Sequence, residues 1–124
     1  MLKHQLLHPQ ISAALARAGH SSKVLITDGN FPHWTRRGPN AEVVYLNLAP
    51  GFTTVSDVLK VLVTAIPVEK AEAMDYYRTG PYALSSDPEA WSDYRQLLAD
   101  TDCGGKLDLL ERFKFYKAAE APDV

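Results

Sequence analysis

Residues 23–29 read KVLITDG, a short apolar and β-branched run that ends at an aspartate and a glycine. This pattern is typical of a strand that is buried on both faces of a sheet. Apolar residues also recur at helical spacing over 11–18, and Gly19 follows them, which predicts an amphipathic helix that begins near Pro9. We therefore expect a helix that leads directly into a central strand.

The rest of the chain continues this alternation of helices and strands. Thr54 with Asp57 forms a capping pattern ahead of an apolar stripe, and Asp87 with Pro88 marks another helix start. We expect further strands over 42–47, 68–77 and 106–110, and further helices over 54–66, 88–98 and 111–120. Elements that alternate at this spacing favour an α/β domain with a largely parallel sheet between layers of helices.

Length and composition limit the classes of protein to consider. A chain of 124 residues and 13.7 kDa has the size of one domain, so we expect a single domain over 1–124. With 46% hydrophobic and 23% charged residues, the chain resembles globular proteins rather than disordered or fibrous ones. The net charge of -2, without long runs of one sign, argues against nucleic acid and membranes as partners and favours a small neutral ligand.

The sequence also bears on where the protein works. No segment has the apolar length of a signal peptide or a membrane span, and the single Cys103 has no partner for an internal disulfide. Such cysteine usage suits a reducing compartment. We therefore expect a soluble cytoplasmic protein.

Two residues near the first predicted strand are candidates for acid-base chemistry. Asp28 follows the strand directly, and ligands of parallel sheets bind outside the carboxyl ends of the strands. An aspartate before Gly29 can equally be a turn residue that bonds its own backbone, so both interpretations stay open. His20 follows the first helix, and its imidazole can exchange protons near neutral pH, although a surface histidine at a helix end is the alternative.

Arg112 and the rings near it form a second candidate group. The guanidinium can donate to sugar hydroxyls or carboxylates, and the rings of Phe113, Phe115 and Tyr116 can stack on the apolar face of a sugar. The alternative is stronger for the rings, because Phe113 and Tyr116 share one helix face and such residues most often belong to the core.

The sequence offers no recognisable cofactor or metal motif. His4 and His8 have no cysteine or carboxylate cluster near them, and Cys103 has no histidine close to it in sequence. The glycine pair at 104–105 precedes a predicted strand, which is the wrong order for a phosphate-binding loop. His33 lies in the loop over 30–40 and is either a lid residue or faces solvent. We expect neither a cofactor nor a metal ion.

Four short segments carry a further signal through their order and spacing. They are Gly19-His20, TDGNFP at 27–32, SDVL at 56–59 and RFKFY at 112–116. Together they resemble the ribose pyranase and fucose mutarotase family over nearly the whole chain, and the Asn30-Phe31-Pro32 turn is closer to the fucose mutarotase branch. Members of the family continue with another strand and a Tyr-x-Asn motif, neither of which we identify between Tyr116 and Val124.

The resemblance implies a fold, an assembly and an activity. The fold is a three-layer α/β/α domain with a mostly parallel sheet. The assembly is a homo-oligomeric ring, typically a decamer, with sites completed by a neighbouring subunit. The activity is that of a monosaccharide mutarotase, an isomerase that interconverts the α and β anomers of a free sugar such as fucose or ribose by acid-base catalysis.

The resemblance also assigns roles to individual residues. The histidine that matches His20 is the catalytic proton donor in the family. The positions that match Asp28 and Arg112 bind the sugar, and we add Tyr116 as a substrate-binding residue beside Arg112.

Two other functions stay open at this point. One is a monosaccharide-binding or sugar-transport-associated protein that has the same scaffold without turnover. The other is a structural ring subunit that carries no ligand. Acceleration of anomer exchange separates the enzyme from both, and a sugar titration separates the last two from each other.

Overall fold

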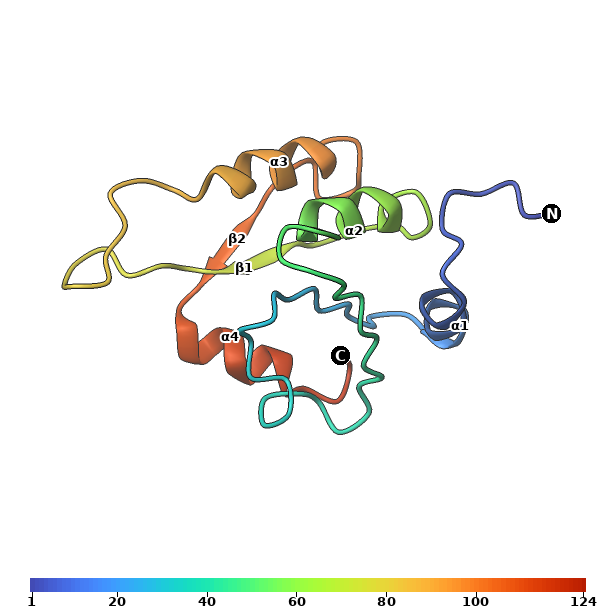
Figure 1. The fold of residues 1–124 in the computed structure, drawn as a ribbon, viewed down its shortest axis with the longest axis horizontal. Coiled ribbons are helices and arrows are strands. Elements are labelled where there is room, and N and C mark those ends of the chain that lie inside the picture. Colours follow the sequence, from blue (N-terminus) through green and yellow to red (C-terminus); the bar gives the residue numbers. More distant parts are fainter.

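The computed structural model describes residues 1–124 and has an α/β fold. Its elements follow in the order α1 (Pro9–Arg17), α2 (Val55–Leu62), β1 (Glu72–Met74), α3 (Glu89–Leu97), β2 (Asp108–Leu110) and α4 (Arg112–Ala119). Figure 1 shows α2 and α3 on one side of the strand pair and α4 on the other. The predicted order of helix, sheet and helix layers is therefore present, with a small sheet at its centre.

The two strands form a parallel pair, and α3 connects them. Glu72 lies opposite Asp108, Ala73 opposite Leu109 and Met74 opposite Leu110. Parallel strands need a crossover of this kind, because the chain must return to the same end of the sheet before it pairs again. The carboxyl ends of both strands consequently lie at the same edge of the sheet. α2 packs against α3, and α4 packs against β1.

Local hydrogen bonds explain where α1 and α2 begin. Nδ1 of His8 accepts the Ile11 N–H at 3.4 Å, directly ahead of Pro9 in the first turn. At α2, Oγ1 of Thr54 accepts the Asp57 N–H at 3.2 Å, and Oδ2 of Asp57 accepts the Thr54 N–H at 2.8 Å. These bonds satisfy backbone donors that a helix leaves unpaired, so both helix starts expected from the sequence are confirmed.

The start of α3 differs from the prediction. Asp87 does not cap this helix, because its Oδ1 accepts the Tyr76 hydroxyl at 2.9 Å and the carboxylate is thereby engaged by the segment that follows β1. Pro88 occupies the cap position without a side-chain hydrogen bond. A local capping preference has here yielded to a contact between segments that are distant in sequence.

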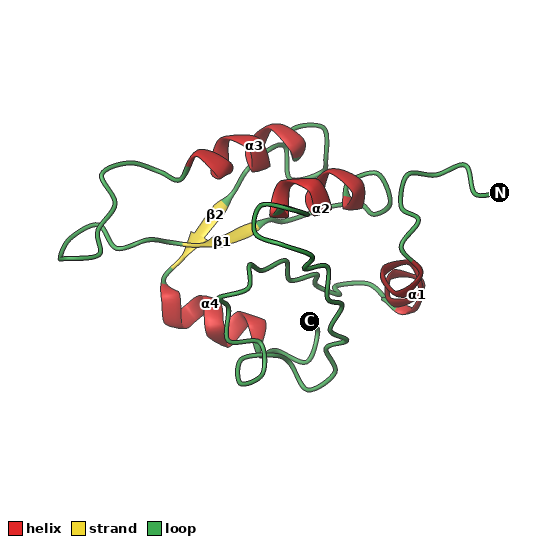
Figure 2. Cartoon of the chain, in the orientation of Figure 1, coloured by secondary structure: helices red, strands yellow, loops and turns green.

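The segments 23–27 and 42–47 form no strands, so these two predictions are wrong. No backbone hydrogen bond joins 24–27 or 42–47 to another backbone segment, and Figure 2 draws both as loop. Their β-branched residues favour an extended backbone, but a strand also requires a hydrogen-bonded neighbour. The strands expected over 68–77 and 106–110 are likewise present only where they pair, over 72–74 and 108–110.

The buried apolar side chains are few and come from separate elements. Leu62 of α2, Trp91 of α3 and Leu98 just beyond α3 are almost fully enclosed. Ala119 at the end of α4 and Leu6 ahead of α1 are also buried. The core therefore lies mainly where α2 and α3 pack together.

Much of the chain's surface is exposed. The accessible surface is 9070 Å². A compact monomer of this mass exposes about 6,600 Å², so the chain exposes roughly 2,500 Å² more than the usual scaling gives. None of the helices has both the length and the apolar character that a membrane span requires.

Candidate functional site

A cluster of one cation and two phenols follows the edge where the two parallel strands end. Tyr77 follows β1, and Arg112 follows β2 as the first residue of α4. The Asp75 N–H donates to the Leu110 carbonyl at 2.7 Å, which holds these two exits side by side. Ligands of parallel α/β sheets bind outside this edge, so we describe the candidate site from here.

The guanidinium of Arg112 is held by two phenols. Its Nε donates to the Tyr116 hydroxyl at 3.0 Å, and its Nη1 donates to the Tyr77 hydroxyl at 3.3 Å. The same guanidinium also lies over the Tyr116 ring, 5.5 Å from its centroid. The hydroxyls of Tyr77 and then Tyr116 raise the pKa of Arg112 above its ordinary value, so the group is a fixed cation.

No carboxylate neutralises this cation. Arg112 takes part in none of the salt bridges of the chain. The adjacent acid, Glu111, caps α4 instead: its Oε2 accepts the N–H of Phe113 at 3.0 Å and that of Lys114 at 3.3 Å. A guanidinium has five N–H donors, and Arg112 donates only two hydrogen bonds to other side chains of the chain. The remaining donors are available to the hydroxyls of a ligand.

Phe31 links the Asp28 turn to α4. Its ring packs edge-on against Tyr116, with centroids 5.9 Å apart, and against Phe115 at 6.3 Å. Asp28 lies in the same turn: its carbonyl accepts the Phe31 N–H at 3.4 Å, and its Oδ1 accepts the Asn30 N–H at 3.0 Å. The structure therefore places the Asp28 turn against the helix that carries Arg112.

The turn interpretation of Asp28 agrees with its observed contact, because one carboxylate oxygen bonds the local backbone. The other oxygen has no hydrogen-bond partner in the chain. The side chain is exposed, so this oxygen can accept from a ligand hydroxyl. The charge of Asp28 also contributes to raising the pKa of Tyr94, although burial of the Tyr94 phenol is the larger cause and Asp93 the second.

His20 makes no hydrogen bond or ion pair with the side chains of this group. It is exposed in the turn after α1, and no hydrogen bond joins it to Asp28, Arg112 or Tyr116. The next residue, Ser21, has a φ of 65°, in the left-handed region that residues with a Cβ rarely adopt. Of the four residues expected from the sequence, contacts join the segments of Asp28, Arg112 and Tyr116, and none of these contacts involves His20.

The expectation that Phe113 belongs to the core is wrong. Its side chain is 68% exposed and meets Tyr116 edge-on at 6.3 Å. The helical spacing placed these two rings on one face correctly, but that face is turned to solvent at Phe113. Tyr116 is half-buried, with Phe31 on one side and the Arg36 guanidinium 5.4 Å from its ring centroid.

Tyr77 is a member of the site that the sequence alone does not reveal. A single strand over 68–77, as the sequence predicts, makes Tyr77 a strand residue without a role. The strand instead ends at Met74, so Tyr77 falls in the segment just beyond a carboxyl end. The Tyr76-Tyr77-Arg78 run ahead of Thr79 and Gly80 is the only signal of this in the sequence.

His33 is part of a separate aromatic group on the loop over 30–40. Its Nε2 lies 3.2 Å from the Tyr45 hydroxyl, and its ring lies against Trp34 at 5.5 Å. His33 is half-buried, so it does not simply face solvent. Both of its ring nitrogens have partners, because Nδ1 is also 3.4 Å from the Phe31 carbonyl.

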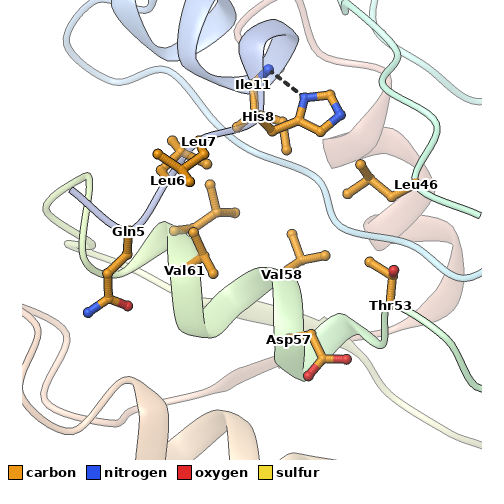
Figure 3. Close-up of a pocket in the computed structure, with 11 residues that line it drawn as sticks. Gln5, Leu6, Leu7, His8, Ile11, Leu46, Thr53, Asp57, Val58 and Val61 are labelled. Atoms are coloured by element: carbon orange, nitrogen blue, oxygen red, sulfur yellow. Dashed lines mark hydrogen bonds between the residues drawn. The ribbon is translucent and has the colours of Figure 1, made fainter. Parts of the chain in front are cut away.

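An apolar cavity of about 290 Å³ lies at a different place, between the segment before α1 and α2. Figure 3 shows Leu6, Val58 and Val61 pointing into it, with His8 bonded to Ile11 at its rim. None of the residues expected to bind a sugar lines this cavity. Its walls suit an apolar side chain better than a polyhydroxylated ring.

Comparison with known proteins fixes the family. The chain matches the model of the RbsD / FucU transport protein family over residues 1–123. The chain belongs to this family. Fucose mutarotase from Mus musculus is 29% identical over 128 residues, which cover 94% of this chain and 76% of the mouse protein. D-ribose pyranase from Variovorax paradoxus (strain S110) is 37% identical over 71 residues, which cover 57% of this chain and 51% of that protein.

A crystal structure agrees with this membership of the RbsD / FucU family. FucU from Bifidobacterium longum superposes with a TM-score of 0.71 and 30% identity, over 93% of this chain and 80% of that one. The α/β fold and the family resemblance expected from the sequence are both confirmed. The fucose mutarotase matches more of the chain than the ribose pyranase does, as the Asn30-Phe31-Pro32 turn indicated.

Proposed function

We propose that this chain is a monosaccharide mutarotase, which interconverts the α and β anomers of a free sugar, with residues 1–124 acting as one domain. Family membership supports the reaction class, since the relatives are named fucose mutarotase and D-ribose pyranase. The observation in this chain that carries the proposal is the unpaired Arg112 cation beside the Asp28 turn. Such a site donates to and accepts from neutral hydroxyls without needing a charged substrate.

Anomer exchange requires one proton to move between two oxygens. In our proposal the neutral imidazole of His20 takes the proton of the anomeric hydroxyl, the bond from the anomeric carbon to the ring oxygen breaks, and an aldehyde forms. The imidazolium then returns that proton to the ring oxygen. Rotation about the bond next to the aldehyde and reversal of the same steps gives the other anomer. A positioned proton carrier contributes about 10² to 10⁴ in rate, so neither a cofactor nor a metal is required.

The other site residues hold the sugar during these steps. Arg112 donates to sugar hydroxyls from the N–H groups that Tyr77 and Tyr116 leave unused. Asp28 accepts from a hydroxyl through its unpaired carboxylate oxygen. Tyr116 offers its ring edge and hydroxyl beside them, which makes it a substrate-binding residue in this proposal.

We propose that a homo-oligomeric ring, such as a decamer, brings His20 of one copy to the Arg112 site of another. The surface excess of roughly 2,500 Å² supports assembly, since a standard interface buries about 800 Å² per partner. The exposure of His20 and its lack of contact with Arg112 within the chain are consistent with a site shared between copies. The single Cys103 suits a reducing compartment, so we place the activity in the cytoplasm.

A sugar-binding protein without turnover is the second candidate. The family's description as transport proteins favours it specifically. Both candidates need the Arg112 site, and only the enzyme needs the proton carrier.

Saturation-transfer NMR on free fucose, ribose and galactose tests the proposed function. We expect the protein to accelerate transfer of saturation between the two anomeric proton signals of at least one sugar. Binding of these sugars without any acceleration would favour the non-catalytic protein. If the protein neither binds these sugars nor accelerates their exchange, only a structural role remains for the chain.

A further inference from the structure

The hydroxyl of Tyr77 joins the segment that follows β1 to the segment that follows β2. Tyr77 lies beyond the carboxyl end of β1 and is 50% exposed. Its hydroxyl accepts from Nη1 of Arg112, a residue 35 positions later, at 3.3 Å. No other hydrogen bond of the chain involves this hydroxyl, so its contact with Arg112 is its one connection.

Tyr116, the second phenol bonded to Arg112, cannot orient the guanidinium relative to the sheet. Tyr116 lies one helical turn further along α4, so its bond to Nε ties the guanidinium only to the helix that already carries it. Tyr77 comes from the other strand exit. Its bond therefore fixes the direction of the guanidinium relative to the edge of the sheet, where a ligand would bind.

The chemistry of the partner also matters. A carboxylate at the Tyr77 position would neutralise Arg112 and take two of its donors in a bidentate pair. A phenol takes one donor and leaves the positive charge in place. The pair of phenols thus restricts a long, flexible side chain while keeping the rest of its planar fork open.

We propose that Tyr77 is a positioning residue of the sugar site, which orients the Arg112 guanidinium toward the substrate without neutralising it. The inference rests on the proposed function and goes beyond it, because it assigns a role to a residue outside His20, Asp28, Arg112 and Tyr116. Tyr77 acts through Arg112 and need not touch the sugar.

Tyr77→Phe is the direct test, since it removes only the hydroxyl. The backbone of Tyr77 is anchored separately, because its carbonyl accepts the Leu84 N–H at 3.2 Å, and the ring is retained. We expect KM for anomer exchange to rise roughly fivefold to tenfold, as for the loss of one typical intramolecular hydrogen bond. We expect kcat to change less than about twofold and the urea midpoint to stay the same. Tyr82→Phe is the matched control, because that hydroxyl has no partner, and it should leave KM unchanged.

A double-mutant cycle separates positioning from other effects. The sugar Kd, measured by NMR titration, should rise for Tyr77→Phe and for Arg112→Ala, and Tyr77→Phe should add nothing in the Arg112→Ala background. An unchanged KM and Kd for Tyr77→Phe would overturn the inference, as would an equal effect in both backgrounds. If the unaltered protein neither binds nor exchanges any sugar, the proposed function fails first and takes this role with it.

Discussion

Phe31 and Tyr116 pack edge to face with their ring centroids 5.9 Å apart. This contact joins a turn from the first third of the chain to the last helix. It matters because Asp28 lies in the turn of Phe31, and Arg112 lies one helical turn before Tyr116. The carboxylate and the cation of the candidate site are thereby held on one scaffold by an apolar contact rather than by an ion pair.

Removal of the Phe31 ring should separate the two halves of the site. For Phe31→Ala we expect a loss of about 2 kcal/mol in the free energy of unfolding, roughly half of the cost for a fully buried phenylalanine. The KM for the sugar should rise, because the Asp28 turn is no longer fixed against α4. Urea unfolding and anomer-exchange kinetics measure the two effects. Phe52→Ala is the control, since Phe52 is 64% exposed; equal effects of the two changes would contradict this reading.

The capping box of α2 makes stability depend on acid pH. Hydrogen bonds from the backbone and side chain of Thr54 lower the pKa of Asp57. A lowered folded-state pKa means that the contribution is complete above the unfolded value near ~4 and is lost as pH falls through the lower folded value. Urea midpoints between about pH 5 and pH 2 should therefore fall less steeply for Asp57→Asn than for the unaltered protein.

Asp100→Asn is a suitable control for that experiment, because the Asp100 carboxylate makes neither a hydrogen bond nor an ion pair. It should reproduce the pH profile of the unaltered chain. An Asp57→Asn profile parallel to that of the unaltered protein would show that the cap does not carry the acid sensitivity.

The backbone beside His20 is strained at Ser21, whose φ is 65°. A residue with a Cβ pays about 1–2 kcal/mol in this region, whereas glycine adopts it readily. Because glycine also loses more backbone entropy on folding, we expect Ser21→Gly to stabilise the chain by only about 0.5 kcal/mol. Ser22→Gly, without a positive φ to relieve, should destabilise it by a similar amount. A loss of stability for Ser21→Gly would argue against the left-handed turn after α1.

The exposed surface predicts assembly in solution. Sedimentation velocity at micromolar concentration should give species well above 13.7 kDa. The excess surface of roughly 2,500 Å² is about three times the 800 Å² or so that one partner buries in a standard interface. We therefore expect each copy to contact more than one neighbour. A stable monomer at these concentrations would contradict the shared site.

The parts of the fold that depend on local chemistry could be predicted from the sequence. Thr54 and Asp57 mark the start of α2 because their bonds are made within one turn. Pro9 marks the start of α1 because the N–H that proline lacks would be unpaired in the first turn of a helix. The prediction of a strand at 23–27 was wrong because β-branched residues favour an extended backbone, and they do not indicate whether another segment pairs with it. The helix cap expected of Asp87 failed because Tyr76, from another segment, competes for its carboxylate.

The residues of the candidate site differ in the same way in whether the sequence alone reveals them. Asp28 could be found because it directly follows an apolar run, and Arg112 because it stands beside three aromatic residues in the sequence. Tyr77 could not, since its role depends on a contact with Arg112 across 35 positions and on where β1 ends. The exposure of Phe113 could not be inferred either, because helical spacing defines a shared face without stating what covers it.

The proton carrier is tested most directly by saturation-transfer NMR between sugar anomers with His20→Ala. His4→Ala is the matched control, because His4 is also exposed and has no hydrogen-bond partner. We expect His20→Ala to lose the acceleration of exchange while its urea midpoint and sedimentation stay those of the unaltered protein, and we expect His4→Ala to keep full activity. If His20→Ala still exchanges the anomers at the unaltered rate, His20 is not the proton carrier.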